Sequence, residues 1–370
     1  MRLASYNVEN LFDRAKAMNL ETWADGKLVL ERFAELNKLL GEIDYTPAIK
    51  TRMAELMLLL GLEKSDKGPF VILRRNRGGL LKRPKSGGVE IIADGRAEWS
   101  GQLELIDEPV NERAMRNTAR VMADVNADIL AVVEAENRPA LVAFNDEIIA
   151  AIGGAPFHQV MVIDGNDERG IDVGLLTRKG YAIGRMRSHV DDRAPNGERI
   201  FSRDCPEFSV ELPGGGSMLV LVNHLKSKGY GGAAASNAKR RLQAERIAQI
   251  YRERVADGET HIAIVGDLND TPKSEPLKPL LQSTDLKDVS EFPGFDDVGF
   301  PGTFGPSTES NKIDYILLSP ALFAKVTAAG YWRQGMWAGV RPQKWGVYAE
   351  LTKPHESGSD HAAVWVDIAV

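Results

Sequence analysis

Nine short apolar runs recur along this chain of 370 residues, and each is five to seven residues long. That length is typical of β-strands and too short for most helices. The predicted strands are residues 2–8, 128–133, 159–163, 172–177, 208–212, 218–223, 261–265, 314–318 and 362–367. Helices are predicted among them at residues 114–125, 139–152 and 237–255. Because the helices are interspersed without strict strand–helix–strand units, we predict an α/β (α+β) fold. Its expected form is a four-layer α/β/β/α sandwich of two mostly antiparallel sheets with helices outside.

Residues 18–115 break this pattern. They open with two helical segments, residues 28–40 and 48–60, and continue with a strongly basic stretch and strand-like segments at 89–93 and 99–106. We therefore predict one domain over residues 1–370 with an insertion at 18–115 after the first strand. The insertion combines helices with an antiparallel hairpin or small sheet, and its basic hairpin is expected at residues 70–90.

Composition excludes several classes of protein. The net charge of −6 excludes a generally basic nucleic-acid coat, and the single Cys205 excludes an internal disulfide and a cysteine-based metal site. No stretch reaches the roughly 18 apolar residues of a membrane-spanning helix. The N-terminus reads as a strand and not as a signal peptide. We expect a cytoplasmic protein with no membrane partner and no obligate protein partner.

Five predicted strands end in, or lie next to, polar residues where an apolar strand would otherwise simply stop. These segments are 7–10, 134, 223–227, 266–270 and 359–361. Taken singly, each also fits a turn, a strand cap or a hydrogen-bonded histidine. Taken together they supply carboxylates, amides and imidazoles, which suit a hydrolytic site that binds Mg²⁺ or, as the alternative ion, Mn²⁺. Glu9 and Glu134 would be unfavourable together beside a closed core unless a cation neutralised them.

Three motifs in this order resemble the endonuclease/exonuclease/phosphatase superfamily of metal-dependent phosphoesterases: residues 266–269 (Gly-Asp-Leu-Asn), 313–317 (Ile-Asp-Tyr-Ile-Leu) and 359–361 (Ser-Asp-His). The superfamily includes pancreatic-type deoxyribonucleases, abasic-site endonucleases, inositol-polyphosphate phosphatases and neutral sphingomyelinases. The resemblance starts at residues 6–11 (Tyr-Asn-Val-Glu-Asn-Leu) and covers nearly all of the chain outside the insertion.

The resemblance implies a role for each polar strand end. In the family pattern, Asp267 orients or deprotonates the attacking water. His361 contacts a phosphate oxygen, and Asp314 fixes its tautomer. Some relatives have tyrosine where this chain has His224, so the role of that histidine stays open. The implied catalytic residues are Asn7, His224, Asp267, Asn269, Asp314 and His361, and the implied metal ligands are Glu9, Glu134 and Asp360. Glu136 is left as a spare carboxylate on the surface.

The substrate is indicated less directly. Six basic residues face a single acid, Glu90, within residues 70–90: Arg74, Arg75, Arg77, Lys82, Arg83 and Lys85. A basic hairpin could grip a nucleic-acid backbone. The alternative is a solvated edge whose charges block sheet pairing. Lys226 lies in a segment, residues 223–229, that resembles the corresponding stretch of bacterial nuclease-like members. Arg169 begins a segment, residues 169–176, that resembles the family's strand after the substrate loop. Both residues are further candidates for substrate binding.

The sequence therefore predicts Mg²⁺-dependent hydrolysis of a phosphate ester, with a nucleic-acid phosphodiester as substrate and a DNA endonuclease or exonuclease as the favoured enzyme. A phosphomonoesterase or a lipid- or inositol-type phosphoesterase of the same superfamily is the first alternative. A non-catalytic module that binds phosphate ligands or nucleic acid is the second.

Overall fold

The computed structural model describes residues 1–370 except 10, 19–22, 168–169, 229–231 and 341–342. The chain divides into two compact units. The first comprises Met1–Phe12, Val110–Lys228 and Gly232–Val370, and the second comprises Asp13–Pro109. Among the described residues, none of the helices is both long and apolar enough to cross a bilayer.

The first unit contains two large sheets. The seven-stranded sheet has the order β16 (Phe295–Asp296), β18 (Val326–Trp332), β19 (Ala363–Ile368), β1 (Arg2–Asn7), β8 (Ile129–Ala135), β10 (Asp172–Thr177) and β9 (Gln159–Ile163). The six-stranded sheet has the order β11 (Ile183–Arg187), β12 (Glu207–Glu211), β13 (Ser217–His224), β14 (Ile262–Asp267), β17 (Asp314–Leu318) and β15 (Lys287–Asp288). Both are mostly antiparallel. The parallel neighbours are β1 with β8, β16 with β18, and β13 with β14.

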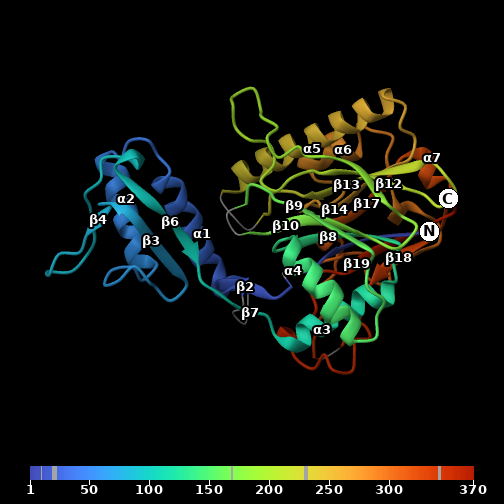
Figure 1. Ribbon diagram of the computed structural model, residues 1–370, viewed down its shortest axis with the longest axis horizontal. Helices are drawn as coiled ribbons and strands as arrows, with labels where there is room; N and C mark the ends of the chain where they lie inside the picture. Colours follow the sequence, from blue (N-terminus) through green and yellow to red (C-terminus); the bar gives the residue numbers. More distant parts are fainter. Residues whose placement is uncertain (10, 19–22, 168–169, 229–231, 341–342) are drawn as a thin grey trace. The chain divides into compact units, whose positions relative to one another are not determined.

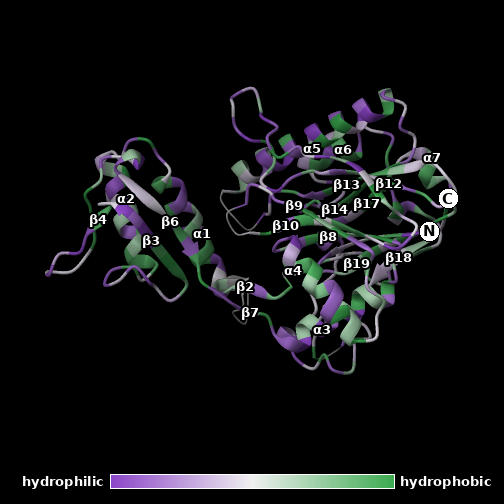
Figure 2. Cartoon of the chain, viewed as in Figure 1, coloured by the Kyte–Doolittle hydropathy of each residue, from purple (hydrophilic) through white to green (hydrophobic). Residues whose placement is uncertain are grey.

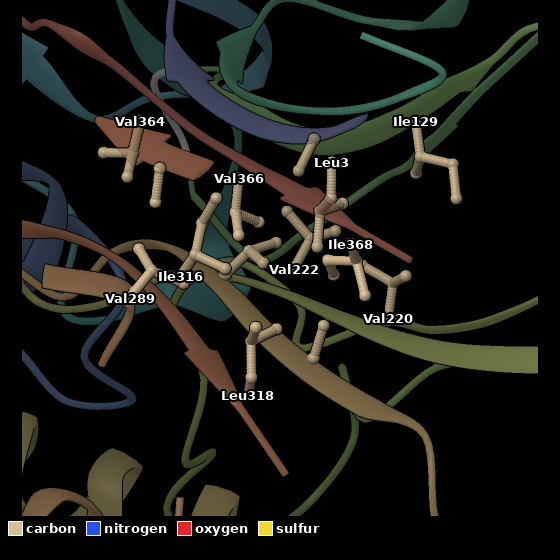
Figure 3. Close-up of a cluster of buried hydrophobic side chains, with 14 of the residues drawn as sticks. Leu3, Ile129, Val220, Val222, Val289, Ile316, Leu318, Val364, Val366 and Ile368 are labelled. Atoms are coloured by element: carbon tan, nitrogen blue, oxygen red, sulfur yellow. The ribbon is translucent and has the colours of Figure 1, made fainter. Parts of the chain in front are cut away.

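The core lies between the two sheets, because successive side chains of a strand point to opposite faces. Val220 and Val222 of β13 face inward to the shared core, whereas Leu219 and Leu221 face outward to α5 (Ala233–Ala256). Inward side chains from both sheets point toward one another in Figure 3. Each fully buried aliphatic side chain contributes about 1.5–3 kcal/mol.

Helices cover the two outer faces. α3 (Glu112–Val125), α4 (Arg138–Ala143) and the π-helical turn Phe144–Ile149 pack on the seven-stranded sheet. α5 and α6 (Lys278–Leu281) pack on the six-stranded sheet, on the opposite side in Figure 1. α5 alternates between hydrophobic and hydrophilic colouring along its length in Figure 2, as expected of a helix with one face on a sheet. The predicted four-layer sandwich is confirmed.

The second unit has a hydrophobic core of its own. α1 (Trp23–Leu40) and α2 (Pro47–Leu59) pack with β3 (Val71–Gly78) and β6 (Trp99–Leu105). α2 begins where the side chain of Thr46 caps the backbone N–H of Ile49 and proline occupies its first position. β2 (Asp13–Ala15) pairs with β7 (Asp107–Pro109) where the chain enters and leaves the unit. The insertion was placed at residues 18–115, whereas this unit runs from Asp13 to Pro109.

The insertion contains small antiparallel sheets, one of the two forms expected, whereas the basic hairpin expected at residues 70–90 is wrong in its pairing. β3 pairs antiparallel with β6, which lies beyond residue 90, and the short β4 (Leu81–Lys82) pairs with β5 (Glu90–Ile91). The reason is the apolar start of β3. Val71 and Leu73 are buried and oppose Leu105 and Leu103 of β6, so the longer ladder also joins the core of the unit.

A buried ion-pair network fastens α5 to β12. Glu207 is 3 % exposed, its Oε1 lies 2.8 Å from Nε2 of His189, and Nε of Arg254 on α5 donates to its Oε2 at 2.7 Å. Burial raises the pKa of Glu207, but hydrogen bonds from His189 and Arg254 outweigh burial and lower that pKa to about 2. The folded protein therefore favours the carboxylate.

Acid should destabilise the protein through Glu207. Its contribution is fully present above the ordinary pKa near 4.5 and is lost as pH falls toward about 2. The shift corresponds to about 3 kcal/mol. In urea unfolding between pH 7 and pH 3, Glu207→Gln should lower stability at pH 7 and flatten the acid limb. The exposed Glu211→Gln on the same strand is the control. A Glu207→Gln protein with the wild-type acid limb would contradict this role of Glu207.

Candidate active site

Four strand ends from the two sheets converge at one edge of the first unit. In the seven-stranded sheet Asn7 of β1 lies opposite Val133 of β8, and in the six-stranded sheet His224 of β13 lies opposite Asp267 of β14. The ends of parallel neighbouring strands lie at the same edge of a sheet. The polar residues at the ends of β1 and β8, and those at the ends of β13 and β14, therefore lie close together. Nδ2 of Asn7 lies 3.5 Å from Oδ2 of Asp267. Nε2 of His224 lies 3.5 Å from Oε1 of Glu134. The site therefore spans both sheets.

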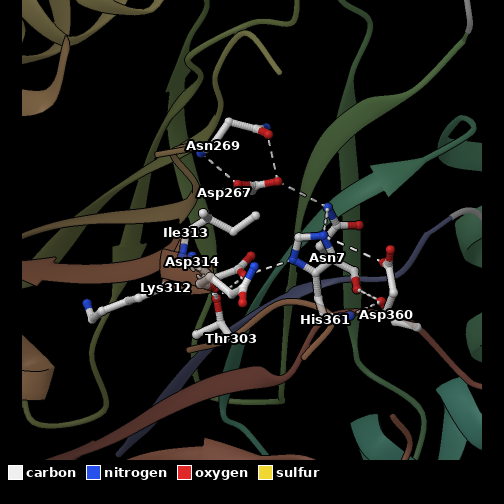
Figure 4. A network of polar contacts seen from close by, with 12 residues as sticks. Asn7, Asp267, Asn269, Thr303, Lys312, Ile313, Asp314, Asp360 and His361 are labelled. Atoms are coloured by element: carbon white, nitrogen blue, oxygen red, sulfur yellow. Dashed lines mark hydrogen bonds and ion pairs between the residues drawn. The ribbon is translucent and has the colours of Figure 1, made fainter. Parts of the chain in front are cut away.

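His361 and Asp314 form a closely held pair. Nδ1 of His361 lies 2.8 Å from Oδ2 of Asp314, and the same oxygen accepts the hydroxyl of Thr303 at 2.6 Å. An ionised carboxylate only accepts hydrogen bonds, so Nδ1 of His361 carries a proton. The other ring nitrogen, Nε2, lies 3.5 Å from Nδ2 of Asn7. Burial lowers the pKa of His361, but the charges of Asp314 and Asp360 outweigh burial and hold that pKa well above its ordinary value. The imidazole is thus oriented by Asp314, as Figure 4 shows, and the raised pKa favours its charged form.

Asp267 lies at the centre of the site. Its Oδ1 accepts the backbone N–H of Asn269 at 2.7 Å, and its Oδ2 accepts Nδ2 of the same residue at 3.1 Å. Oδ2 also lies 3.7 Å from Nε2 of His224. Burial and then the charge of Asp314 raise the pKa of Asp267 to about 8, although the charge of His361 opposes them. A cation beside Asp267 would favour the carboxylate form.

Glu9, Glu134 and Asp360 are the carboxylates that the sequence assigns to a metal ion. Glu9 and Glu134 lie at the ends of the neighbouring strands β1 and β8, and the backbone N–H of Asp360 donates to Oε2 of Glu9 at 3.2 Å. All three residues are half-buried. Their oxygen atoms are the hard ligands that Mg²⁺ and Mn²⁺ prefer. This donor set fits a divalent ion, and the assignment of these three as ligands stays a prediction.

A second group could also hold an ion. One ligand atom each from Asp267, Asp314 and His361 lies within 4.8 Å of the others. In this group, Nδ1 of His361 and Oδ2 of Asp314 already bond to each other. A metal ligated by those two atoms would have to replace that hydrogen bond. We therefore treat His361 and Asp314 as a hydrogen-bonded pair.

The backbone of the site is strained. Glu9, Glu134 and Asn269 have φ of 51°, 64° and 53°, in the left-handed region that non-glycine residues seldom occupy. Such strain concentrates at functional sites. Gly266, immediately before Asp267, has φ of 125°, and a Cβ there would lie 2.0 Å from the backbone oxygen of Asn223. The sharp end of β14 therefore requires glycine at this position.

A model of the endonuclease/exonuclease/phosphatase family matches residues 83–325. The chain belongs to this family. Its members are phosphoesterases that generally depend on a divalent metal. Of the predicted catalytic and metal-binding residues, the matched segment leaves out Asn7, Glu9, Asp360 and His361. A comparison with curated protein sequences found no match.

Solved structures share the fold of this family member. A mannosyl-6-phosphatase from Bacteroides thetaiotaomicron superposes with a TM-score of 0.51 at 17% identity, covering 70% of this chain and 92% of the other. A family protein from Bacteroides vulgatus gives 0.50 at 16% identity, covering 70% and 92%. Identities this low support a common fold and carry no information on substrate.

The predicted substrate-binding residues are not all in one place. Lys226 follows His224 in the loop after β13, within the first unit. Arg169 lies outside the described residues. The remaining five lie in the second unit: Arg74, Arg75, Arg77, Lys82 and Arg83.

Ion pairs occupy three of those five arginine and lysine side chains. Nε of Arg74 lies 2.5 Å from Glu104, and Arg75 and Arg83 both lie 2.7 Å from Asp66. Acids from outside residues 70–90 therefore reduce the local excess of positive charge. Arg77 and Lys82 are exposed.

The expected surface role of Glu136 is wrong. The residue is half-buried, and its Oε1 accepts the backbone N–H groups of Leu11 and Phe12, each at 2.7 Å. Glu136 lies two residues after Glu134, so it ties the segment that follows Glu9 to the end of β8. The signal was available in the sequence only as an additional acid next to a strand end.

Two positioning contacts were not anticipated. Thr303 binds the carboxylate of Asp314, and its hydroxyl oxygen accepts the backbone N–H groups of Ile313 and Asp314, each at 3.1 Å. Ser359 donates its hydroxyl to the backbone oxygen of Asn7 at 2.7 Å and accepts the backbone N–H of His361 at 3.0 Å. Thr303 lies in an irregular segment, where no periodicity marks it. Ser359 belongs to a motif in which the neighbouring acid and histidine drew the attention.

Gly266 allows a sharp test of the backbone at the site. Gly266→Ala should destabilise the protein by more than about 2 kcal/mol, because it combines left-handed strain with a backbone clash. Gly258→Ala is the matched control, since Gly258 has φ of 95° and a Cβ there meets nothing within 4 Å. Urea unfolding of both variants measures the difference. Equal losses of stability would show that the close approach to Asn223 does not matter.

Proposed function

We propose that this protein is a phosphodiesterase that hydrolyses nucleic acid with Mg²⁺, for which Mn²⁺ can substitute. The observation that carries the hydrolytic part of the proposal is the convergence of the His361–Asp314 pair, Asp267 and Asn7 at the strand ends of both sheets. An oriented cationic imidazole, a buried carboxylate and an amide donor are the groups that phosphate-ester hydrolysis needs.

In this proposal Glu9, Glu134 and Asp360 hold the metal. The bound ion would supply positive charge to the phosphate oxygens as a Lewis acid. Charge on such an ion also favours the ionised form of Asp267, whose pKa of about 8 reflects burial next to Asp314.

The remaining groups act on water and phosphate. Asp267 accepts a proton from the attacking water, and Asn269, bonded to both oxygens of Asp267, orients that water. Nε2 of His361 donates to a non-bridging phosphate oxygen while Asp314 keeps the proton on Nδ1. Nδ2 of Asn7 and the imidazole of His224 donate to the same phosphate group. Each donor is held before substrate arrives, so little reorganisation is needed.

Removing the proposed base or donor should abolish most turnover without unfolding the protein. Asp267→Asn and His361→Ala should each lower metal-dependent kcat by about 10²–10⁴-fold, as general bases and charge-stabilising donors do. The assay is nicking of supercoiled plasmid with Mg²⁺ or Mn²⁺, repeated with EDTA. Asp146→Asn, an exposed acid of the same unit, is the control. Full metal-dependent activity in Asp267→Asn would refute the role given to Asp267.

The choice of nucleic acid rests on local charge. The second unit has sixteen Lys and Arg against sixteen Asp and Glu between Asp13 and Pro109, so it is not basic overall. Its positive charge is concentrated between Arg74 and Lys85, where no acid occurs. Arg77, Lys82 and Lys85 are exposed there. Exposed clustered cations bind a phosphate backbone with strong salt dependence.

Neutralising these three residues tests the nucleic-acid assignment. Arg77→Gln/Lys82→Gln/Lys85→Gln should raise KM for polynucleotide and reduce the salt slope of binding by about one for each phosphate that the protein no longer neutralises. Hydrolysis of a small phosphodiester such as bis(p-nitrophenyl) phosphate should be unchanged.

The control triple changes the same charge on α1 and α2 of the same unit: Lys38→Gln/Lys50→Gln/Arg52→Gln. Equal effects of both triples would remove the special role of residues 74–85. If the wild type released phosphate from monoesters and cleaved no nucleic acid, the protein would be a phosphomonoesterase and not a phosphodiesterase.

A further inference from the structure

α5 buries polar side chains on the face that it presents to the six-stranded sheet. Arg240, Gln243 and Arg254 lie on this face, with Ala244, Ile247 and Tyr251 between them. Arg254 reaches Glu207 of β12. Arg240 and Gln243 are both 0 % exposed and lie at the other end of the face. Burying a guanidinium and an amide is unfavourable unless their hydrogen bonds are made, so their partners should explain why they are there.

Both side chains hold the backbone of one residue, Lys226. Oε1 of Gln243 accepts the backbone N–H of Lys226 at 2.8 Å, and Nη1 of Arg240 donates to its backbone oxygen at 2.6 Å. Gln243 also donates to the backbone oxygen of Ile200 at 3.2 Å, and Arg240 to Oδ1 of Asn237 at 2.5 Å. The loop that leaves β13 just after His224 is thereby fixed by α5.

The guanidinium of Arg240 also reaches the neighbouring strand end. Its Nε donates to Oδ2 of Asp270 at 3.0 Å, and Asp270 lies three residues after Asp267. Burial raises the pKa of Asp270, but hydrogen bonding to Lys228 and the charge of Arg240 outweigh burial and hold that pKa below its ordinary value. The hydroxyl of Tyr315 donates to the backbone oxygen of Asp270 at 2.8 Å. One buried cation therefore bridges the segments that follow β13 and β14.

We propose that Arg240 is a positioning residue that fixes the strand end carrying His224 and Lys226 against the strand end carrying Asp267 and Asn269. The inference rests on the proposed function, because it assigns catalytic work to those two segments. Other contacts also run between the same segments, and one of them is the ion pair between Nζ of Lys228 and Oδ1 of Asp270 at 2.6 Å. The backbone N–H of Leu225 donates to the backbone oxygen of Asp267 at 2.9 Å, and Nδ2 of Asn269 donates to the backbone oxygen of Leu225 at 3.1 Å.

Geometry, and not charge alone, should make Arg240 necessary. The planar guanidinium donates in three directions at once, to Asp270, to Lys226 and to Asn237. A lysine ammonium at the same position has a shorter reach and no fixed fork. Small displacements of catalytic groups lower rates strongly, with about 1 Å worth on the order of 10²-fold. Loss of the bridge should therefore appear in kcat, since substrate can still enter the site.

The experiment compares Arg240→Met, Arg240→Lys and Asp270→Asn with Arg241→Gln. Arg241 is the next residue on α5, is exposed and pairs with Glu245, so it matches Arg240 in charge and helix position. With Mg²⁺ and a small phosphodiester, kcat should fall about 100-fold in Arg240→Met and at least about 10-fold in Arg240→Lys. KM should change less than about threefold, and Arg241→Gln should stay within about twofold of wild type. A wild-type kcat in folded Arg240→Lys would overturn the proposal.

Hydrogen–deuterium exchange separates positioning from folding. In the full-length protein, amides of residues 224–228 and 267–271 should lose protection in Arg240→Met and Arg240→Lys, while those of β1 and β8 keep it. Arg241→Gln should leave both regions protected. General loss of protection in the arginine variants, with kcat falling only in proportion to the folded fraction, would show a merely structural role and overturn the proposal. Asp270→Asn keeps the test available if Arg240→Met does not fold.

The same two measurements distinguish failure of the inference from failure of the proposed function. A wild type that cleaves no phosphate ester refutes the function, and the inference falls with it, even if the local exchange effect shows that Arg240 holds the two segments. A wild type that cleaves phosphodiesters, together with a folded Arg240→Met that keeps kcat within about threefold, refutes the inference and leaves the function standing.

Discussion

Two parallel strand pairs, β1 with β8 and β13 with β14, determine where the chemistry of this protein can lie. The sheets around them are mostly antiparallel, and antiparallel neighbours end at opposite edges. Only the parallel pairs bring two consecutive carboxyl ends to the same edge. A parallel pair also requires a long crossover, and α5 occupies the one between β13 and β14. The second unit and α3 occupy the other. The crossover helix α5 is thus placed to reach both strand ends that it connects.

Such a site requires a set of polar groups to be buried among apolar strands. Asn7, His224 and Asp267 are each at most 3 % exposed and lie at the ends of buried strands. Nδ2 of Asn7 reaches Oδ2 of Asp267 across the sheets, and Ser359 and Thr303 hold the backbone and carboxylate that complete the set. The raised pKa of Asp267 shows that this arrangement disfavours the carboxylate unless positive charge is nearby. A divalent cation would therefore stabilise the site as well as act in it.

Sequence patterns predicted the elements whose signal is local and missed those whose signal is not. All nine predicted strands are present, because apolar runs of that length bury readily between two sheets. β18 was missed, since Ala328, Ala329 and Gly330 give it no apolar alternation, and β11 reads as polar because Gly184 and two arginines occupy its five residues. The pairing of β3 was missed for a different reason. Its partner begins 21 residues after β3 ends, and hairpin reasoning favours the nearest strand.

The residues of the site likewise divide into those with a local signal in the sequence and those without one. Polar residues at strand ends were visible because they interrupt apolar runs, and the motif order joined them into one site. Arg240 was not visible as a positioning residue. A basic residue on an amphipathic helix reads as exposed, and only the fold shows that this one turns toward the sheet and meets Asp270. Residues that act through another residue's backbone leave no chemical signature of their own in a sequence.

Glu136 shows how a carboxylate that looks like a spare surface acid in the sequence can support the backbone of the site. Phe12 and Val110, which flank the second unit along the chain, are joined by a backbone hydrogen bond of 2.7 Å, and Oε1 of Glu136 accepts the N–H groups of Leu11 and Phe12. Leu11 and Phe12 are thereby fastened to the end of β8. Because Glu9 and Glu134 lie two residues from Leu11 and Glu136, the same contacts hold the backbone close to two of the proposed metal ligands.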